Sequence, residues 1–306
     1  MQLGAVFPQF EIGTDPVVIR DYAQTAEGLG FRHLMVIEHV LGANVHRPDR
    51  QSLPGTDRQS LPGTGRQGRR WPHDSDEEFH EPFVLLGFLA AVTQEIELAT
   101  GVIVLPQRQT ALVAKQAAAA DVLSRGRLRL GVGVGWNDVE FEALGMDFGN
   151  RGQRIVEQIR VLRLLWTKPL VTFEGRYHKI TDAGINPLPV QRPIPIWMGG
   201  NAEPVLRRVA RITDGWSLSG EPQPGTEVQW GRIKEYAREA GRDPSTIGLQ
   251  GALRYGDGDP QRWRRVLERW QQIGATHVYL NTVRSGLTAP RDHIAALHRA
   301  KRELGF

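Results

Sequence analysis

The chain alternates between short apolar segments and longer amphipathic segments along almost its whole length. Residues 3–7 and 33–37 have the length and composition of buried strands, whereas residues 16–29 place apolar side chains at helical spacing and stop at Gly30. Eight strand segments can be counted, at residues 3–7, 33–37, 96–105, 127–134, 195–198, 216–218, 247–253 and 277–280. Eight strand–helix units favour a closed parallel (β/α)8 barrel, a TIM barrel, over an open sheet.

Length and composition fit a single barrel domain over residues 1–306. Hydrophobic residues make up 40% of the chain and charged residues 24%, which allows a large core and argues against global disorder. The absence of cysteine excludes disulfides, thiolate metal sites and cysteine nucleophiles. No apolar run approaches the roughly 20 residues that span a bilayer, and the N-terminus does not resemble a signal peptide. We therefore expect a cytoplasmic protein without a membrane partner.

Two segments interrupt the alternation. Residues 50–57 (RQSLPGTD) are repeated almost unchanged as residues 58–65, and residues 47–70 have the Arg, Pro and Gly content of a flexible loop. That loop alone carries a positive excess equal to the net charge of +4, so the rest of the chain is balanced and a nucleic-acid partner is not expected. Residues 168–192 contain a hairpin pattern around Glu174 and Gly175 and are expected to leave the barrel.

The run LRLGVGVGWN at residues 128–137 begins as an apolar strand and ends in glycines that lead into an acidic, helix-starting segment. Glycines at a strand end let the backbone approach a ligand, and helix N-terminal N–H groups favour an anion such as phosphate. The pattern departs from the G-x-G-x-x-G of a dinucleotide fold, and tight packing of strand against helix is the other explanation for the glycines. We interpret the run as part of a ligand site.

Residues at the strand ends supply the candidate site. They are Glu38, His39, Gly101, Val102, Gly135, Trp136, Asn137, Gly199, Gly200 and Asn201. The nine histidines show no metal-ligand spacing, and no serine has a nucleophile-elbow context, so no metal is expected. An acid–base residue, an aromatic wall and a glycine-rich anion cradle are the set expected where a bound cofactor carries the chemistry.

Two acidic residues have competing interpretations. Glu38 could orient His39 or could pair with an arginine, and the sequence leaves both open. Glu157 is expected to form an ion network with Arg151 and Arg154, either on the helix surface or at the bottom of the barrel.

Seven segments, in this order along the chain, resemble the luciferase-like monooxygenase superfamily. They are IEH (37–39), ELATGV (97–102), VLPQR (104–108), AKQ (114–116), DVLSRGR (121–127), LGVGVGW (130–136) and PIWMGG (195–200). The similarity covers residues 1–218 well, and within the superfamily it is greatest to the branch that uses coenzyme F420. Members of the superfamily that use FMN share the same sequence segments.

The resemblance implies a luciferase-like TIM barrel with insertions that forms a homodimer and binds F420, or alternatively FMN, over the strand ends. It implies a cis peptide bond between Gly101 and Val102 behind the ring, and it places His39 near the reactive face of that ring. It also places Gly199–Asn201 where the cofactor phosphate is held. Trp136 occupies the position of a catalytic glutamate in the family's sugar-phosphate dehydrogenase, so a more apolar substrate is expected.

These observations predict an oxidoreductase that transfers a hydride between F420 and an unidentified small organic substrate. His39 would donate or accept the accompanying proton, with Glu38 and Trp136 as the other candidate catalytic residues. Two alternatives remain open: an FMNH2-dependent monooxygenase that activates oxygen on the same fold, and a non-catalytic carrier of F420 or flavin.

Overall fold

The computed structural model describes residues 1–42, 75 and 77–306, and a parallel sheet that closes on itself forms the centre of these residues. The sheet runs β3-β2-β1-β11-β10-β9-β8-β5-β4, and an additional pairing of β3 with β5 closes it. Its strands are β1 (Gln2–Val6), β2 (His33–Val36), β3 (Glu97–Thr100), β4 (Ile103–Val104), β5 (Leu128–Gly133), β8 (Ile196–Gly199), β9 (Gly215–Ser217), β10 (Gly248–Arg254) and β11 (His277–Asn281). Because β3 and β4 are two halves of one barrel strand, the described residues confirm the predicted (β/α)8 barrel.

The break between β3 and β4 is a local bulge. Ala99 pairs with Arg129 and Ile103 pairs with Val132, so four steps along one strand match three along the other. The peptide bond between Gly101 and Val102 within this break is cis, as the family resemblance predicted. The bulge brings the backbone of residues 100–102 over the neighbouring strand β5.

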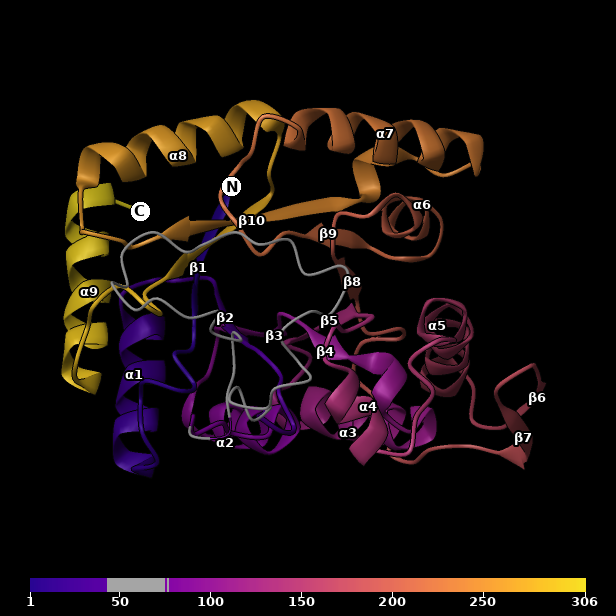
Figure 1. The fold of residues 1–306 in the computed structure, drawn as a ribbon. Coiled ribbons are helices and arrows are strands. Elements are labelled where there is room, and N and C mark those ends of the chain that lie inside the picture. The colour runs from indigo at the N-terminus through magenta and orange to yellow at the C-terminus, as the bar shows by residue number, and fades with distance from the viewer. Residues whose placement is uncertain (43–74, 76) are drawn as a thin grey trace, which may run out of the picture.

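Helices surround the barrel (Figure 1). They are α1 (Pro16–Gly28), α2 (Pro82–Val92), α3 (Thr110–Leu123), α4 (Asp138–Ala143), α5 (Arg151–Thr167), α6 (Glu203–Ile212), α7 (Thr226–Glu239), α8 (Pro260–Ile273) and α9 (Pro290–Leu304). The helices α1, α2 and α8 each begin with proline, and the carboxylates of Asp15, Glu81 and Asp259 accept from their first-turn N–H groups. Local sequence therefore fixes these three starts.

The sequence pattern did not predict α7. This helix buries only a narrow stripe that includes Trp230, Ile233 and Ala237, and the rest of its surface faces solvent. It packs on α6, and its apolar spacing is too sparse to stand out from a loop without that partner.

The predicted hairpin is present as β6 (Val171–Glu174) and β7 (Lys179–Ala183), which lie outside the barrel beside α5 (Figure 1). Glu157 on α5 fastens it: the carboxylate lies 2.7 Å from Nδ1 of His178 and accepts from the N–H groups of Arg176 and Tyr177 at 2.8 Å. The expected network of Glu157 with arginines of its own helix is therefore wrong. The predicted loop at 47–70 lies outside the described residues.

A polar cluster lies inside the barrel where the strands begin. The rings of His33 and His277 are 5.5 Å apart, and Trp197 lies between His277 and the guanidinium of Arg129, which stacks on it at 4.5 Å. Burial, with the charge of Arg129 next in importance, lowers the pKa of His277 to about 3 and that of His33 well below its ordinary value. Both histidines are therefore neutral in the folded protein at neutral pH.

We expect these histidines to make folding sensitive to acid. An unfolded histidine takes up a proton as the pH falls through about 6.5, whereas the folded His277 does not until about pH 3. The contribution of these histidines to the free energy of unfolding is therefore fully present above pH 6.5. It falls as the pH is lowered from there, by up to about 1.4 kcal/mol per pH unit for each such histidine. Urea unfolding between pH 7.5 and pH 4.5 measures that slope. His277→Gln should make it shallower, and His298→Gln, at an exposed position on α9, should not; equal slopes for His277→Gln and the parent would contradict the assignment.

No helix of the described residues is both long and apolar enough to cross a membrane.

Candidate functional site

The predicted site residues lie at one rim of the barrel. Glu38 and His39 follow β2, Gly101 and Val102 lie between β3 and β4, residues 135–137 follow β5, and residues 199–201 end β8. Because the strands are parallel, their carboxyl ends share this rim. A pocket of about 300 Å³ opens here, lined by His39, Val40, Leu41, Gly42, Ser75, Glu77 and Phe79. Among the described residues, no cluster of three or more histidine or acidic side chains could hold a metal.

His39 is the titratable residue of the predicted set that lines this pocket. Its side chain is 11% exposed, and its ring lies edge-to-face against Phe79 at 5.5 Å between ring centres. Trp136, from the end of β5, lies 5.8 Å from the same ring. Two segments that are about a hundred residues apart in sequence thus meet around one imidazole, with aromatic walls on two sides.

Glu38 points away from this pocket. Its carboxylate accepts from the backbone N–H of Val104 and from the guanidinium of Arg108, which also contacts Glu81 at 2.7 Å. Burial raises the pKa of Glu38 above its ordinary value, although Arg108 and the Val104 N–H act in the opposite direction. Of the two roles left open by the sequence, the structure shows pairing with an arginine. Any role of Glu38 in catalysis stays a prediction.

Four glycines at this rim face protein atoms. A Cβ at Gly131 would lie 1.9 Å from the carbonyl oxygen of Thr100, and at Gly133 and Gly199 it would lie 2.6 and 3.0 Å from the side chain of Val102. At Gly101 it would meet Met35 at 2.1 Å. Glycine is therefore required here because the bulge of residues 100–102 lies directly over β5 and β8. Close packing within the chain accounts for these glycines, and cofactor contact by Gly101, Val102 or Gly199 stays a prediction.

The remaining predicted residues mostly serve local structure. Asn137 is the N-cap of α4, with its side chain 3.3 Å from the N–H of Val139. Gly135 has a positive φ of 73° and lies against Val104. The carbonyl of Gly200 accepts from Trp216, and that of Asn201 accepts from Gln229. Their contact with a cofactor stays a prediction.

Sequence reasoning missed a group of three arginines beside this rim. Arg151 and Arg154 occupy the first turn of α5, where the helix dipole favours negative charge, and the guanidinium of Arg208 on α6 lies against Gly152 in the same turn. Within the described residues none of the three pairs with a carboxylate, and the buried Nε atoms of Arg151 and Arg154 have no hydrogen-bond partner. Arg151 also donates to the carbonyl oxygen of Phe148. The positive charge of the three guanidinium groups at a helix N-terminus is suited to an anion such as phosphate.

A signal for this group was present in the sequence. Basic residues in the first turn of a helix oppose the helix dipole, so R-x-x-R directly after Asn150 was a departure from the usual pattern. Its interpretation required Arg208, which comes from a different helix.

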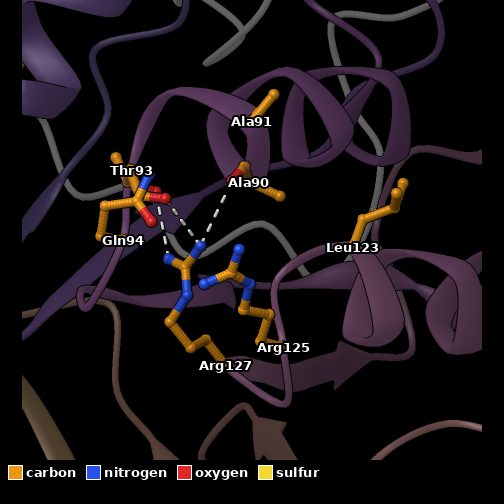
Figure 2. A pocket seen from close by; sticks show the side chains of 7 residues that line it. All are labelled: Ala90, Ala91, Thr93, Gln94, Leu123, Arg125 and Arg127. Carbon is orange, nitrogen blue, oxygen red and sulfur yellow. Dashed lines mark hydrogen bonds between the residues drawn. The ribbon is translucent and has the colours of Figure 1, made fainter.

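A second hollow of about 170 Å³ lies where β5 begins, at the opposite end of the barrel from His39, and Figure 2 shows the side chains that line it. Its central residue is Arg127, which donates to the carbonyl oxygens of Thr93 and Ala90 at 3.0 and 3.3 Å (Figure 2). Arg127 also donates to the carbonyl oxygen of Ile96 at 2.7 Å. Ala90 and Thr93 belong to the C-terminal end of α2, so Arg127 caps that helix. Because these hydrogen bonds of Arg127 are made within the chain, we interpret Arg127 as a residue that stabilises the fold.

We expect Arg127→Met to destabilise the fold by about 2–4 kcal/mol, because the buried carbonyl groups lose a charged donor. The free energy of unfolding in urea measures this effect. Arg125→Met is the matched control, because Arg125 lines the same hollow but is exposed. A loss of less than about 1 kcal/mol for Arg127→Met would show that water replaces the guanidinium without cost.

The family model described as luciferase-like monooxygenase matches residues 8–304. Among relatives, an uncharacterized protein of Mycobacterium tuberculosis H37Rv is 40% identical over 164 residues, which is 54% of this chain and 56% of that protein. The chain thus aligns with little more than half the length of that relative. A second uncharacterized protein of the same organism is 30% identical over 282 residues, covering 91% of this chain and 90% of its own length. An FMNH2-dependent dimethylsulfone monooxygenase of Pseudomonas putida is 30% identical over 166 residues, 53% of this chain and 46% of that enzyme.

Solved structures share the whole fold at low sequence identity. A monooxygenase from Streptomyces bottropensis superposes with a TM-score of 0.77 at 18% identity, covering 99% of this chain and 98% of the other. An F420-dependent secondary alcohol dehydrogenase in complex with an F420–acetone adduct superposes with a TM-score of 0.72 at 19% identity, covering 97% and 98%. At these identities the superpositions show a common fold.

Proposed function

Since the chain belongs to the luciferase-like monooxygenase family, we propose that it is an oxidoreductase that transfers a hydride between coenzyme F420 and a small organic substrate. The position of His39 carries this proposal. An imidazole that is 11% exposed, set among aromatic rings in a pocket at the strand ends, is suited to proton transfer beside a bound redox cofactor. The similarity in fold to an F420-dependent alcohol dehydrogenase supports the choice of cofactor.

The arginine group fits an anionic cofactor tail. Arg151, Arg154 and Arg208 have positive charge without carboxylate partners among the described residues, and they lie at the N-terminus of α5. We assign them to the cofactor phosphate, together with the neighbouring Gly199–Asn201. When bound, F420 would supply a carrier for two electrons and a proton as hydride.

The chain's own residues would then manage the proton and the substrate. For an alcohol substrate, His39 accepts the hydroxyl proton as the hydride leaves the carbon, and it returns that proton in the reverse direction. Trp136 and Phe79 form apolar walls that hold the substrate carbon and exclude water from the pocket. The aromatic walls favour an apolar substrate over a sugar phosphate.

A titration of the apo-protein with F420 and separately with FMN tests the proposal. We expect F420 to bind more tightly, followed by turnover with a panel of small alcohols. Arg154→Gln should weaken binding about tenfold, as expected for one lost charged contact, whereas Arg160→Gln on the same helix should not. Arg160 serves as the control because its guanidinium stacks on Phe173 of the hairpin.

The alternative of an FMNH2-dependent monooxygenase is favoured by one observation, the 30% identity to the Pseudomonas putida enzyme over about half of the chain. FMN binding equal to or tighter than F420 binding, with oxygen uptake by the reduced complex, would replace the F420 proposal with this one.

We also infer that the protein forms a homodimer through α2 and α3. The helix α2 carries no charged residue, and Val84 on it is 75% exposed. The neighbouring α3 adds Leu112 and Leu123, which are 52% and 64% exposed. A helix that is apolar on all faces is normally buried, and a second copy offers the same uncharged surface in return.

Light scattering is expected to show a dimer for the parent chain and a monomer for Val84→Glu combined with Leu112→Glu. The control Val228→Glu, at a 59% exposed position on α7, should remain dimeric. A monomeric parent, or a dimer that survives both glutamates, would contradict this interface.

A further inference from the structure

Arg254 ends β10 on the face of that strand that lines the interior of the barrel. Gln250 identifies this face, because its Nε2 lies 3.2 Å from Sδ of Met35 on β2. Ala252 packs in one buried cluster with Met35 and Tyr279. Successive side chains of a strand alternate between its two faces, so Arg254 continues the interior row of Gln250 and Ala252.

The charge of Arg254 acts on this interior. Tyr279 on the neighbouring β11 pairs with Ala252, and its buried hydroxyl donates to the carbonyl oxygen of Leu218 at 2.8 Å. Burial raises the pKa of Tyr279, and the positive charge of Arg254 acts against this rise. Because such an effect weakens with distance, the guanidinium lies near the barrel mouth, at the rim that also carries His39.

The backbone of Arg254 is held on both sides. Its N–H donates to Oε1 of Glu221 at 2.9 Å, and its carbonyl oxygen accepts from the guanidinium of Arg262. Glu221 and Arg262 also pair with each other at 2.7 Å. The carboxylate of Glu221 is therefore engaged with the side chain of Arg262 and with the backbone of Arg254.

The guanidinium of Arg254 is left for a ligand. The residue is exposed, and within residues 1–42, 75 and 77–306 its side chain makes no hydrogen bond or ion pair. With one carboxylate between two arginines, this part of the rim has one positive charge in excess. A single guanidinium presents a planar fork of donors that matches a carboxylate, whereas the cofactor phosphate is assigned to a group of three arginines.

We propose that Arg254 binds a carboxylate of the substrate, and that the substrates of this site are hydroxy acids whose hydroxyl group lies at His39. This inference rests on the proposed function. The carbon that bears the hydroxyl loses a hydride to F420 and the hydroxyl loses its proton to His39, so a carbonyl forms and the carboxylate is unchanged.

The barrel indicates how far apart the two groups of the substrate are. The strand β10 is three steps from β2 around the sheet, and neighbouring strands are about 4.8 Å apart, so roughly 14 Å of barrel wall separates them. The side chains of His39 and Arg254 shorten that span. A chain of several carbons fits between them, and Phe79 and Trp136 are suitable apolar walls for it.

A series of ω-hydroxycarboxylates of increasing length, each compared with the primary alcohol of the same length, tests the proposal. Calorimetry measures binding to the chain with and without F420, and F420 reduction measures kcat/KM. We expect the parent to prefer the acid about tenfold at the best length, as for one charged contact, and the preference to fall as salt is added.

Arg254→Gln should remove this preference and leave the alcohols unchanged, and Arg254→Lys should keep part of it because the charge remains. Both variants retain the backbone groups that Glu221 and Arg262 hold, so we expect them to fold. The matched control is Arg238→Gln, which changes an exposed arginine in the last turn of α7 and should keep the full preference.

Acids that bind no better than alcohols at any length, or a preference that survives Arg254→Gln, would overturn the proposal. Weaker binding of F420 by Arg254→Gln, with the binding of the acids unchanged, would also overturn it and assign Arg254 to the cofactor. Calorimetry without F420 does not depend on which cofactor the chain uses. A failure of the F420 titration therefore leaves this result intact, and turnover of alcohols without a preference for acids would refute this inference alone.

Discussion

His39→Asn is expected to lower kcat by about 10²- to 10⁴-fold with little change in the free energy of unfolding, because the site loses its proton-transfer group and keeps a polar side chain of similar length. Steady-state reduction of F420 with the best substrate from the alcohol panel measures the effect. Cofactor affinity should change much less than kcat, because the arginines of α5 and α6, and not His39, are the residues proposed to hold the cofactor phosphate.

The matched control is His298→Asn, which changes an exposed histidine on α9. It should leave kcat and stability at parental values. If His39→Asn keeps more than about a tenth of the parental kcat, general acid–base catalysis by His39 is ruled out. The imidazole would then be one wall of the pocket, and the proton would have to exchange directly with water.

Gly131→Ala is expected to destabilise the fold by about 3 kcal/mol or more, since its Cβ would lie 1.9 Å from the carbonyl oxygen of Thr100. The clash is with backbone, which cannot move aside as a flexible side chain can. The shift must separate β3 from β5, the pair that closes the barrel. Urea unfolding measures the loss.

The same glycine-to-alanine change at Gly231 is expected to have the opposite effect on stability. Gly231 lies inside α7, and apart from its chain neighbours and the nearby backbone of its own helix no heavy atom lies within 4 Å of the Cβ it would gain. Alanine there should stabilise by about 0.5–1 kcal/mol through helix propensity. Equal effects of the two substitutions would mean that the barrel relaxes around Gly131, and the steric account of the glycine run would be wrong.

The ligand interpretation of that glycine run illustrates a limit of sequence reasoning. A strand that ends in alternating glycines signals that something approaches the backbone closely. In the structure the approaching groups at Gly131 and Gly133 are Thr100 and Val102 of the neighbouring bulge. The same pattern would result from a ligand or from another strand, because a glycine shows that a group comes close to the backbone but does not show which group it is.

Glu38 and Glu157 illustrate a second limit. Each has several basic groups within reach along the sequence, and local spacing does not rank them. Glu38 pairs with Arg108, seventy residues away, and Glu157 binds the hairpin at Tyr177 and His178 in place of the arginines of its own helix. The choice follows from which elements the barrel sets side by side.

What the sequence determined by itself was the barrel and the rim. Apolar periodicity and helix caps are local properties, and eight parallel strands must bring their carboxyl ends to one edge, which placed His39 and Trp136 near each other. Only the tertiary structure decided which side chains support them. Glu140 on α4 accepts from the N–H groups of Val40 and Leu41, which directly follow His39, and Arg208 on α6 lies against the first turn of α5. These contacts join segments that are far apart in sequence, and they depend on packing that no local pattern encodes.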